Sequence, residues 1–303
     1  MVIATALGPR VKKPEKARAR SETSRKRHWH LSRGESELLT LLAEKPLLSG
    51  AQISAVRMPS TLGKTSLLAQ LERRGLLASS VAPGQVDVPR SRHYYLTDEG
   101  IRALAQREGV VPGHLAKKHW LSASRITTLF NALEHTRACR QFFVDLAIQA
   151  QQHTGDALDV WQDEAAASRR YLWHGDVRLL RPDGYGVYRR NAQALAFFLE
   201  WDSGNSGIKR HRRKLRTYHE CRATLGDRMF PAILMVTVRD RVRQLNRAAW
   251  DEGRRRRDVL LPLLIAVNTE IETCGAFGCR WWDVRAQKTV TLESVPDLWI
   301  EIS

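Results

Sequence analysis

Hydrophobic residues between positions 35 and 108 recur at helical spacing in short segments, and the later part of this region alternates as strands do. The pattern predicts three short helices, two strands joined by a polar loop, and one more helix. Gly75 follows the third helical segment as a stop signal, and Thr97-Asp98-Glu99-Gly100 precedes the last one as a cap. The predicted elements are helices from Glu35, over Ala51–Val56 and over Thr61–Arg74, strands over Leu76–Val81 and Arg92–Leu96, and a helix from Ile101.

Beyond residue 120 the hydrophobic segments become longer. One apolar face over Ser124–His153 predicts a single long helix. Two near-continuous apolar runs are typical of strands buried on both faces. The predicted strands cover Leu158–Gln162, Gly184–Arg189, Leu195–Asp202, Pro231–Val238 and Leu260–Val267, and the predicted later helices cover Gly207–Leu225 and Arg241–Asp251. Strands that alternate with helices indicate an α/β domain with a mixed central sheet.

These patterns divide the chain into four segments. Residues 1–33 carry ten Lys or Arg and two Glu with almost no apolar periodicity, and we expect a disordered basic arm. Residues 34–108 have the element order of an α+β winged helix-turn-helix. Residues 109–119 contain Gly109, Pro112 and Gly113 and are expected to be a linker, and residues 120–303 form the α/β domain.

The charge of the chain indicates a polyanionic partner. There are 49 Lys and Arg against 32 Asp and Glu, which gives a formal net charge of +17. Cations near phosphates release condensed counterions, so this excess favours double-stranded DNA as the partner. No apolar stretch has the length of a membrane span, and four scattered cysteines do not suggest a secreted disulfide scaffold. We therefore expect a cytoplasmic protein with no membrane contact, and a homodimer is left open.

Gly63-Lys64-Thr65 looks like the end of a phosphate-binding loop. That loop needs a glycine five residues earlier, where Met58 stands, so we expect no nucleotide binding. Lys64 and Thr65 are better placed at the start of a recognition helix. The residues expected to contact DNA are Lys64, Thr65, Gln70, Arg73 and Arg92 in the first domain, and Lys209, Arg210, Arg212, Arg213 and Lys214 in the basic helix of the second.

Three carboxylates are the candidate chemistry of the second domain. Asp183 opens one predicted strand, and Glu200 and Asp202 lie at the end of the next on one face. If the strands pair, the carboxylates converge at one sheet end, where Mg²⁺ or Mn²⁺ would relieve their repulsion and activate water. His135, on the predicted long helix, is a candidate proton-transfer or metal-binding group, although a single helical histidine is more often structural.

Two resemblances extend these predictions. The run "LLAQLERRGLL…RSRHYYLTDEGIRAL" resembles the MarR and PadR type of winged helix. The order of a helix, Pro-Asp on a strand and an acidic residue on the following strand resembles the PD-(D/E)xK nuclease fold. More narrowly, "RPDGYGVY…AFFLEWDSGN…KLRTYHE" resembles the plasmid replication-relaxation family, which joins a winged helix to such a domain and is related to relaxases of mobilisable plasmids.

The resemblance implies a restriction-endonuclease-like domain with roles for particular residues. Asp183 matches the aspartate of the motif, Glu200 matches its acidic partner, and Trp201 is expected to offer a backbone carbonyl to the metal. Asp202 stands where the motif has lysine, so Lys209 or Lys214 of the next helix would have to supply the cation.

Two functions remain open from the sequence. The first is a DNA-binding protein of plasmid replication, relaxation or mobilisation with a metal-dependent nickase site. The second is a winged-helix regulator of transcription or replication whose nuclease-like domain is degenerate and has no activity. The missing motif lysine favours the second, whereas the retained Asp183, Glu200 and Asp202 favour the first.

Overall fold

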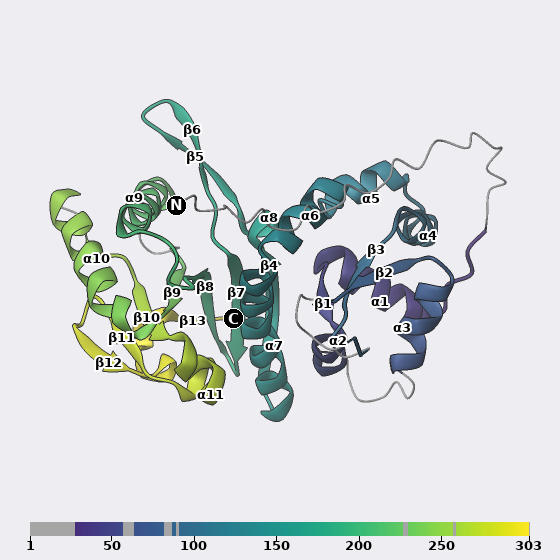
Figure 1. Cartoon of the computed structure of the whole chain (residues 1–303). Helices are drawn as coiled ribbons and strands as arrows, with labels where there is room; N and C mark the ends of the chain where they lie inside the picture. The colour runs from purple at the N-terminus through teal and green to yellow at the C-terminus, as the bar shows by residue number, and fades with distance from the viewer. Residues whose placement is uncertain are drawn as a thin grey trace, which may run out of the picture.

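The chain has an α+β fold in which a small helical unit lies beside a large mixed sheet (Figure 1). The computed structural model describes residues 28–56, 64–81, 87–88, 91–226, 230–256 and 259–302, without the side chains of residues 64–66. The predicted disordered arm therefore lies almost entirely outside the described residues. Within them, no helix combines the length and the apolar character that crossing a membrane requires.

The N-terminal unit contains four helices and a three-stranded antiparallel sheet in the order β1-β3-β2. Its first helix starts with a capping box, in which Ser32 and Glu35 satisfy each other's backbone amides. Leu39, Leu71 and Ala103 are among the completely buried side chains that join its helices in one core. The elements are α1 (Arg33–Glu44), β1 (Leu48–Ser49), α2 (Gly50–Val56), α3 (Lys64–Arg73), β2 (Leu77–Ser80), β3 (His93–Leu96) and α4 (Asp98–Glu108).

Three helices connect this unit to the large sheet, namely α5 (Pro112–Lys118), α6 (Ala123–Asn131) and α7 (Leu133–Gln152). The predicted linker is thus partly helical, and Leu115 of α5 is completely buried in the N-terminal core. The prediction of one long helix is wrong, because Ala132 leaves the helical conformation and separates α6 from α7. The two halves have different packing partners: Phe130 of α6 contacts Tyr95 of β3, whereas α7 covers the large sheet.

The large sheet has eight strands in the order β12-β11-β10-β9-β8-β7-β4, with β13 paired to β8. The central strands β8, β9 and β10 are parallel, and the remaining pairs are antiparallel. The mixed sheet that the sequence predicted is therefore present. Its strands are β4 (Asp156–Asp163), β7 (Gly184–Arg190), β8 (Gln193–Trp201), β9 (Ala232–Thr237), β10 (Leu263–Val267), β11 (Trp281–Asp283), β12 (Lys288–Val290) and β13 (Trp299–Glu301).

Helices cover both faces of this sheet. The helices α9 (Ile208–Leu225) and α10 (Val242–Arg256) connect the parallel strands and lie on one face, and α7 and α11 (Asn268–Gly278) lie on the other (Figure 1). Alternate residues of β8 follow this division, since Phe197 belongs to the α7 core and Phe198 to the α9 core. Glu200 and Asp202 follow Phe198 by two and four residues, so their side chains point to the same face of the sheet as Phe198, toward α9.

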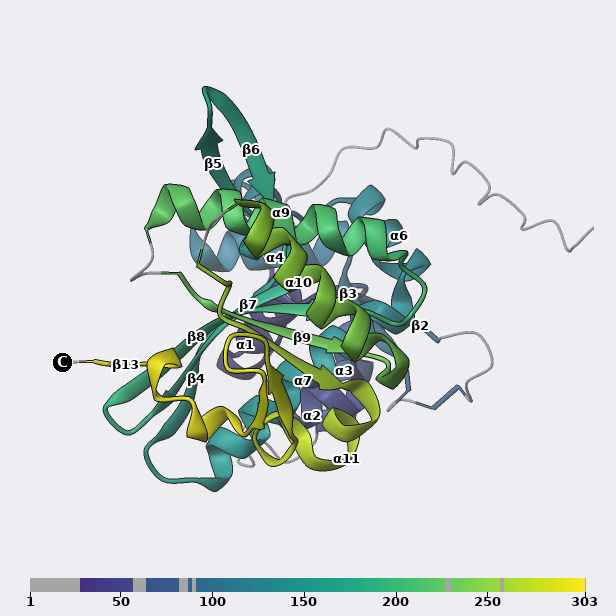
Figure 2. The ribbon, with the colours of Figure 1, turned by 90° about the vertical axis from the view of Figure 1, so that its left-hand side faces the viewer.

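A two-stranded hairpin leaves the body of the domain between the short helix α8 (Glu164–Ala167) and β7. It consists of β5 (Arg169–Trp173) and β6 (Asp176–Leu180), and it projects at the top of both views (Figures 1 and 2). The hydrophobic pattern of the sequence did not predict these strands, because they contain no long apolar run. Leu172 and Val177 are instead exposed, at 59% and 72%.

Gly186 of β7 is expected to tolerate no side chain. A Cβ there would lie 2.4 Å from a ring atom of Phe197 and 2.9 Å from one of Phe143, and these rings are stacked on each other. Gly186→Ala should lower the free energy of unfolding by about 1–3 kcal/mol, as overpacking does, in a urea titration. Gly113→Ala in α5, where a Cβ would meet nothing within 4 Å, is the control and should cause no loss.

Candidate active site

Asp183 stands directly before β7 and is held at the end of the β7–β8 pair. Its backbone N–H donates to the carbonyl of Leu199 at 3.0 Å. Its carboxylate Oδ2 accepts the backbone N–H of Trp201 at 2.7 Å. Because both bonds go to the neighbouring strand, the Asp183 carboxylate is fixed beside Glu200, as the predicted strand pairing required.

Glu200 is 4% exposed and has two partners on α9. Tyr218 donates its hydroxyl to Oε1, and the Lys214 ammonium forms an ion pair with Oε2. Lys214 Nζ also lies 3.6 Å from Asp183 Oδ1, so one cation contacts both carboxylates. Lys214 and Tyr218 are four residues apart and therefore lie on the same face of the helix.

The cation of the site thus comes from helix α9 and not from the strand that carries Glu200. This arrangement agrees with one of the two lysines that the sequence offered. The other, Lys209, is exposed and forms no ion pair with either carboxylate within the described part of the chain. Tyr218 was not among the predicted residues. The spacing of Lys214 and Tyr218 in "KLRTYHE" was the available signal, because a residue four positions after an inward lysine also faces inward.

Burial and the shared lysine set the charges of the two acids. Burial opposes ionisation of Asp183, but the charge of Lys214 and the hydrogen bond with His135 outweigh it and lower the pKa of Asp183 to about 2. Burial raises the pKa of Glu200 to about 7, with Lys214 opposing the rise and Asp183 adding to it. Burial also opposes the charge of Lys214, but the two carboxylates raise its pKa above the ordinary value. Asp183 is therefore the lasting anion of the site, and Lys214 is its lasting cation.

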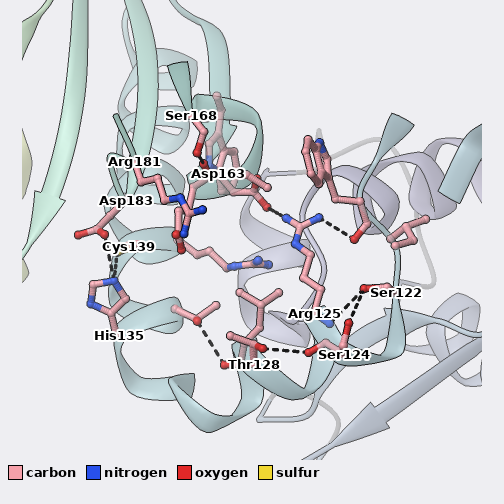
Figure 3. Close-up of a pocket in the computed structure, with 18 of the residues that line it drawn as sticks. Ser122, Ser124, Arg125, Thr128, His135, Cys139, Asp163, Ser168, Arg181 and Asp183 are labelled. Carbon is pink, nitrogen blue, oxygen red and sulfur yellow. Dashed lines mark hydrogen bonds and ion pairs between the residues drawn. The ribbon is translucent and has the colours of Figure 1, made fainter. Parts of the chain in front are cut away.

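Two residues of α7 complete the surroundings of Asp183. His135 Nε2 lies 3.5 Å from Asp183 Oδ1 and 3.6 Å from the Cys139 sulfur (Figure 3). The hydrogen bond with Asp183 raises the pKa of His135, and burial raises the pKa of the Cys139 thiol well above its ordinary value. An imidazole nitrogen of His135, the sulfur of Cys139 and a carboxylate oxygen of Asp183 all lie within 4.8 Å of one another. These three atoms are close enough to hold a metal ion. His135 therefore lies beside Asp183, and its role in proton transfer or metal binding stays a prediction.

Asp202 does not join this cluster, although it was expected to. Its Oδ2 accepts the Thr237 hydroxyl at 2.9 Å and lies 3.4 Å from His211 Nε2 and 3.7 Å from an Arg241 nitrogen. Asp202 follows the last residue of β8, so its side chain meets the N-terminal turn of α9, whereas Glu200 meets the second and third turns. The predicted convergence of three carboxylates is therefore reduced to two, because the same helix supplies a separate partner to each position.

Residues 39–232 match the family described as replication-relaxation. The chain belongs to this family. The matched segment contains all residues of the cluster, namely His135, Cys139, Asp183, Glu200, Lys214 and Tyr218. Comparison with curated proteins finds no match, and comparison with solved structures also finds none.

The residues predicted to contact DNA lie in two groups in this member of the replication-relaxation family. In the first group, Gln70 and Arg73 of α3 are exposed, whereas Arg92 pairs with Asp87 at 2.6 Å. The side chains of Lys64 and Thr65 lie outside the described residues. In the second group, Arg212 pairs with Asp251 at 3.0 Å and Lys214 belongs to the cluster. The exposed cations of that group are Lys209, Arg210 and Arg213.

A large pocket opens beside the cluster. Its volume is about 1040 Å³, and Asp183, His135 and Cys139 form part of its wall (Figure 3). The rest of the wall comes from α5, α6 and α7, from the end of β4 with α8, and from the base of the β5–β6 hairpin. A ligand in this pocket would therefore reach the side chains of Asp183 and His135 directly.

Proposed function

We propose that this protein nicks DNA in plasmid replication, relaxation or mobilisation, with a divalent cation at Asp183 and Glu200. The observation that carries the proposal is the contact of Lys214 with both carboxylates. This contact brings two acids and one lysine together, which supports a PD-(D/E)xK-like site even though the lysine is missing from its usual place in the sequence. The restriction-endonuclease-like fold and the relation to relaxases are part of this proposal.

We further propose that the N-terminal unit is a winged helix-turn-helix that binds duplex DNA. The order of α1, α2 and α3 followed by the β2–β3 hairpin supports this assignment, as does the net charge of +17. α3 would then be the recognition helix, with Gln70 and Arg73 among its exposed side chains. This unit would bring the plasmid to the cluster, since the two parts are joined by direct contacts such as the 3.1 Å hydrogen bond between Gln52 and Gln141.

The donor atoms of the site fit Mg²⁺ or Mn²⁺. Asp183 and Glu200 offer carboxylate oxygens, which hard cations prefer, and the Trp201 carbonyl is adjacent in the chain. A bound ion would polarise the phosphodiester and lower the pKa of water. Lys214 would orient the attacking water and stabilise the charge that develops on the phosphate. His135, hydrogen-bonded to Asp183, would exchange protons at the edge of the site.

The proposal is tested by incubating supercoiled plasmid with the full chain and Mn²⁺ or Mg²⁺ and following conversion to open circle. Asp183→Asn and Glu200→Gln should abolish conversion. The same metal should stabilise the wild type by about 2.7 kcal/mol at roughly 100 times its Kd, since it binds only the folded state, and the variants should lose this gain. Asp159→Asn is a matched control, because Asp159 pairs with Arg189 and lies outside the cluster.

The alternative function is a regulator without enzymatic activity. The observation that favours it is the same ion pairing, because the Lys214 ammonium already contacts both carboxylates at the place where a divalent cation would bind. No conversion above the Asp183→Asn background, combined with no stabilisation by metal, would rule out the nickase under those conditions and favour the regulator. Stabilisation without conversion would leave a site that binds metal but does not cleave.

A further inference from the structure

Arg140 of α7 is a buried cation beside the pocket. It is 4% exposed, and neither of its two terminal nitrogens has a hydrogen-bond partner among the described residues. Burial lowers the pKa of Arg140 to about 10, which is far below its ordinary value. Guanidinium groups keep their charge in proteins, and a buried charge without a partner is strongly unfavourable. An anion that hydrogen-bonds Arg140 would therefore be bound favourably.

Arg140 lines the pocket beside Asp183 and His135. Five Lys or Arg and three Asp or Glu line this pocket, which leaves an excess of positive charge. Arg125 forms an ion pair with Asp163, so this pair is internally neutral, and Arg140 has no ion pair with a carboxylate among the described residues. The charge balance of the pocket therefore favours an anionic ligand near Arg140.

The pocket also offers aromatic surface. Trp120 is 59% exposed, and Trp161 is stacked on Phe143 with ring centroids 5.4 Å apart. All three side chains line the pocket. A volume of about 1040 Å³ is at the upper end for small-ligand pockets, which measure roughly 300–1,000 Å³. Phosphate groups next to planar bases are the ligand that cations and aromatic rings bind together.

We propose that this pocket binds a segment of single-stranded DNA, with a backbone phosphate on Arg140 and a base against Trp120 or Trp161. This inference rests on the proposed function, because it places a single strand next to Asp183, one of the two carboxylates that would cleave it. His135 and Asp183 lie on one side of the pocket, opposite Arg125 and Ser122 (Figure 3). A duplex is too wide to bring its phosphates to a buried guanidinium, whereas one unpaired strand is narrow enough.

The test measures binding of a fluorescent 12-nucleotide thymidine oligomer to the full chain by anisotropy, in EDTA so that no cleavage occurs. Arg140→Gln should weaken binding about tenfold, the effect of one hydrogen-bonded charge on phosphate. It should also reduce the slope of log K against log salt by about 0.7, the contribution of one phosphate of a single strand. Arg140→Lys should keep most of that slope, and duplex binding should change less than twofold in both variants.

Arg280→Gln is the matched control, because Arg280 is exposed directly before β11, which lies five strands from β4 in the sheet order. Its affinity for the oligomer should equal that of the wild type. Wild-type affinity in Arg140→Gln would overturn the inference. The inference would also be overturned if Arg140→Gln weakened single-strand and duplex binding equally and lowered the Tm, because that result indicates a structural role for Arg140. Because the assay contains no metal, a failure of nicking alone leaves this inference standing.

Discussion

Replacing Lys214 by Met is expected to lower the rate of plasmid nicking by about a thousandfold. Lys214 is the one residue of the described chain that forms ion pairs with both Asp183 and Glu200. Its removal takes away the group that orients water and stabilises developing charge, and such groups contribute roughly 10²–10⁴ in rate. The measurement is the initial rate of conversion from supercoiled to open circular plasmid in Mn²⁺.

Two controls separate this role from general effects. Lys209→Met removes an exposed cation five residues earlier on the same helix and should leave the rate within a few fold. Asp202→Asn should also leave nicking nearly unchanged, because Asp202 contacts Thr237, His211 and Arg241 and not Lys214. A rate that falls for Asp202→Asn but not for Lys214→Met would show that the residues chosen from the structure are wrong.

Loss of fold must be distinguished from loss of chemistry in the Lys214 variant. Breaking a buried ion pair by removing one partner costs about 3–5 kcal/mol, because the remaining charge is buried alone. Glu200 has a raised pKa and can take up a proton, which reduces this cost. Binding of duplex DNA by Lys214→Met should therefore remain within a few fold of the wild type at 25 °C, and the Tm of the variant shows whether it is folded.

The sequence predicted the main strands of the large sheet because they are long and almost wholly apolar. β9 (Ala232–Thr237) is buried at every position, and its sequence AILMVT is apolar except for the final threonine. Asp183 and Glu200 could be placed together because paired strands bring fixed positions to the same sheet end. The identity of the lysine could not be decided, since it depends on how α9 is rotated against the sheet.

Features that depend on distant contacts were missed. The β5–β6 hairpin has exposed hydrophobic residues and therefore none of the patterns of a buried strand. The break at Ala132 is invisible because α6 and α7 both have apolar faces, which happen to pack on different neighbours. Arg140 resembles any helical arginine in the sequence, and its burial arises because α7 is covered on several sides at once.

The exposed cations of α9 are expected to provide much of the affinity for duplex DNA. Lys209, Arg210 and Arg213 are exposed, and Arg210 lies one helical turn before Lys214. Arg212 is excluded from this group because its guanidinium pairs with Asp251. The three cations therefore extend a positive surface from the cluster along the N-terminal half of the helix. A plasmid strand whose phosphodiester lies at the cluster would have its neighbouring phosphates within reach of this surface.

The variant in which Lys209, Arg210 and Arg213 are all changed to Gln should bind duplex DNA roughly a hundredfold more weakly. This factor corresponds to about 2.7 kcal/mol, or about 0.9 kcal/mol for each cation, as expected for ion pairs that stay exposed to solvent. The slope of log K against log salt for this variant should fall by about 2.7, or 0.9 for each phosphate. The matched control changes Arg243, Arg247 and Arg254 on the exposed side of neighbouring α10. Equal losses in the two triple variants would mean that net charge alone determines binding, and that α9 has no particular place on the DNA.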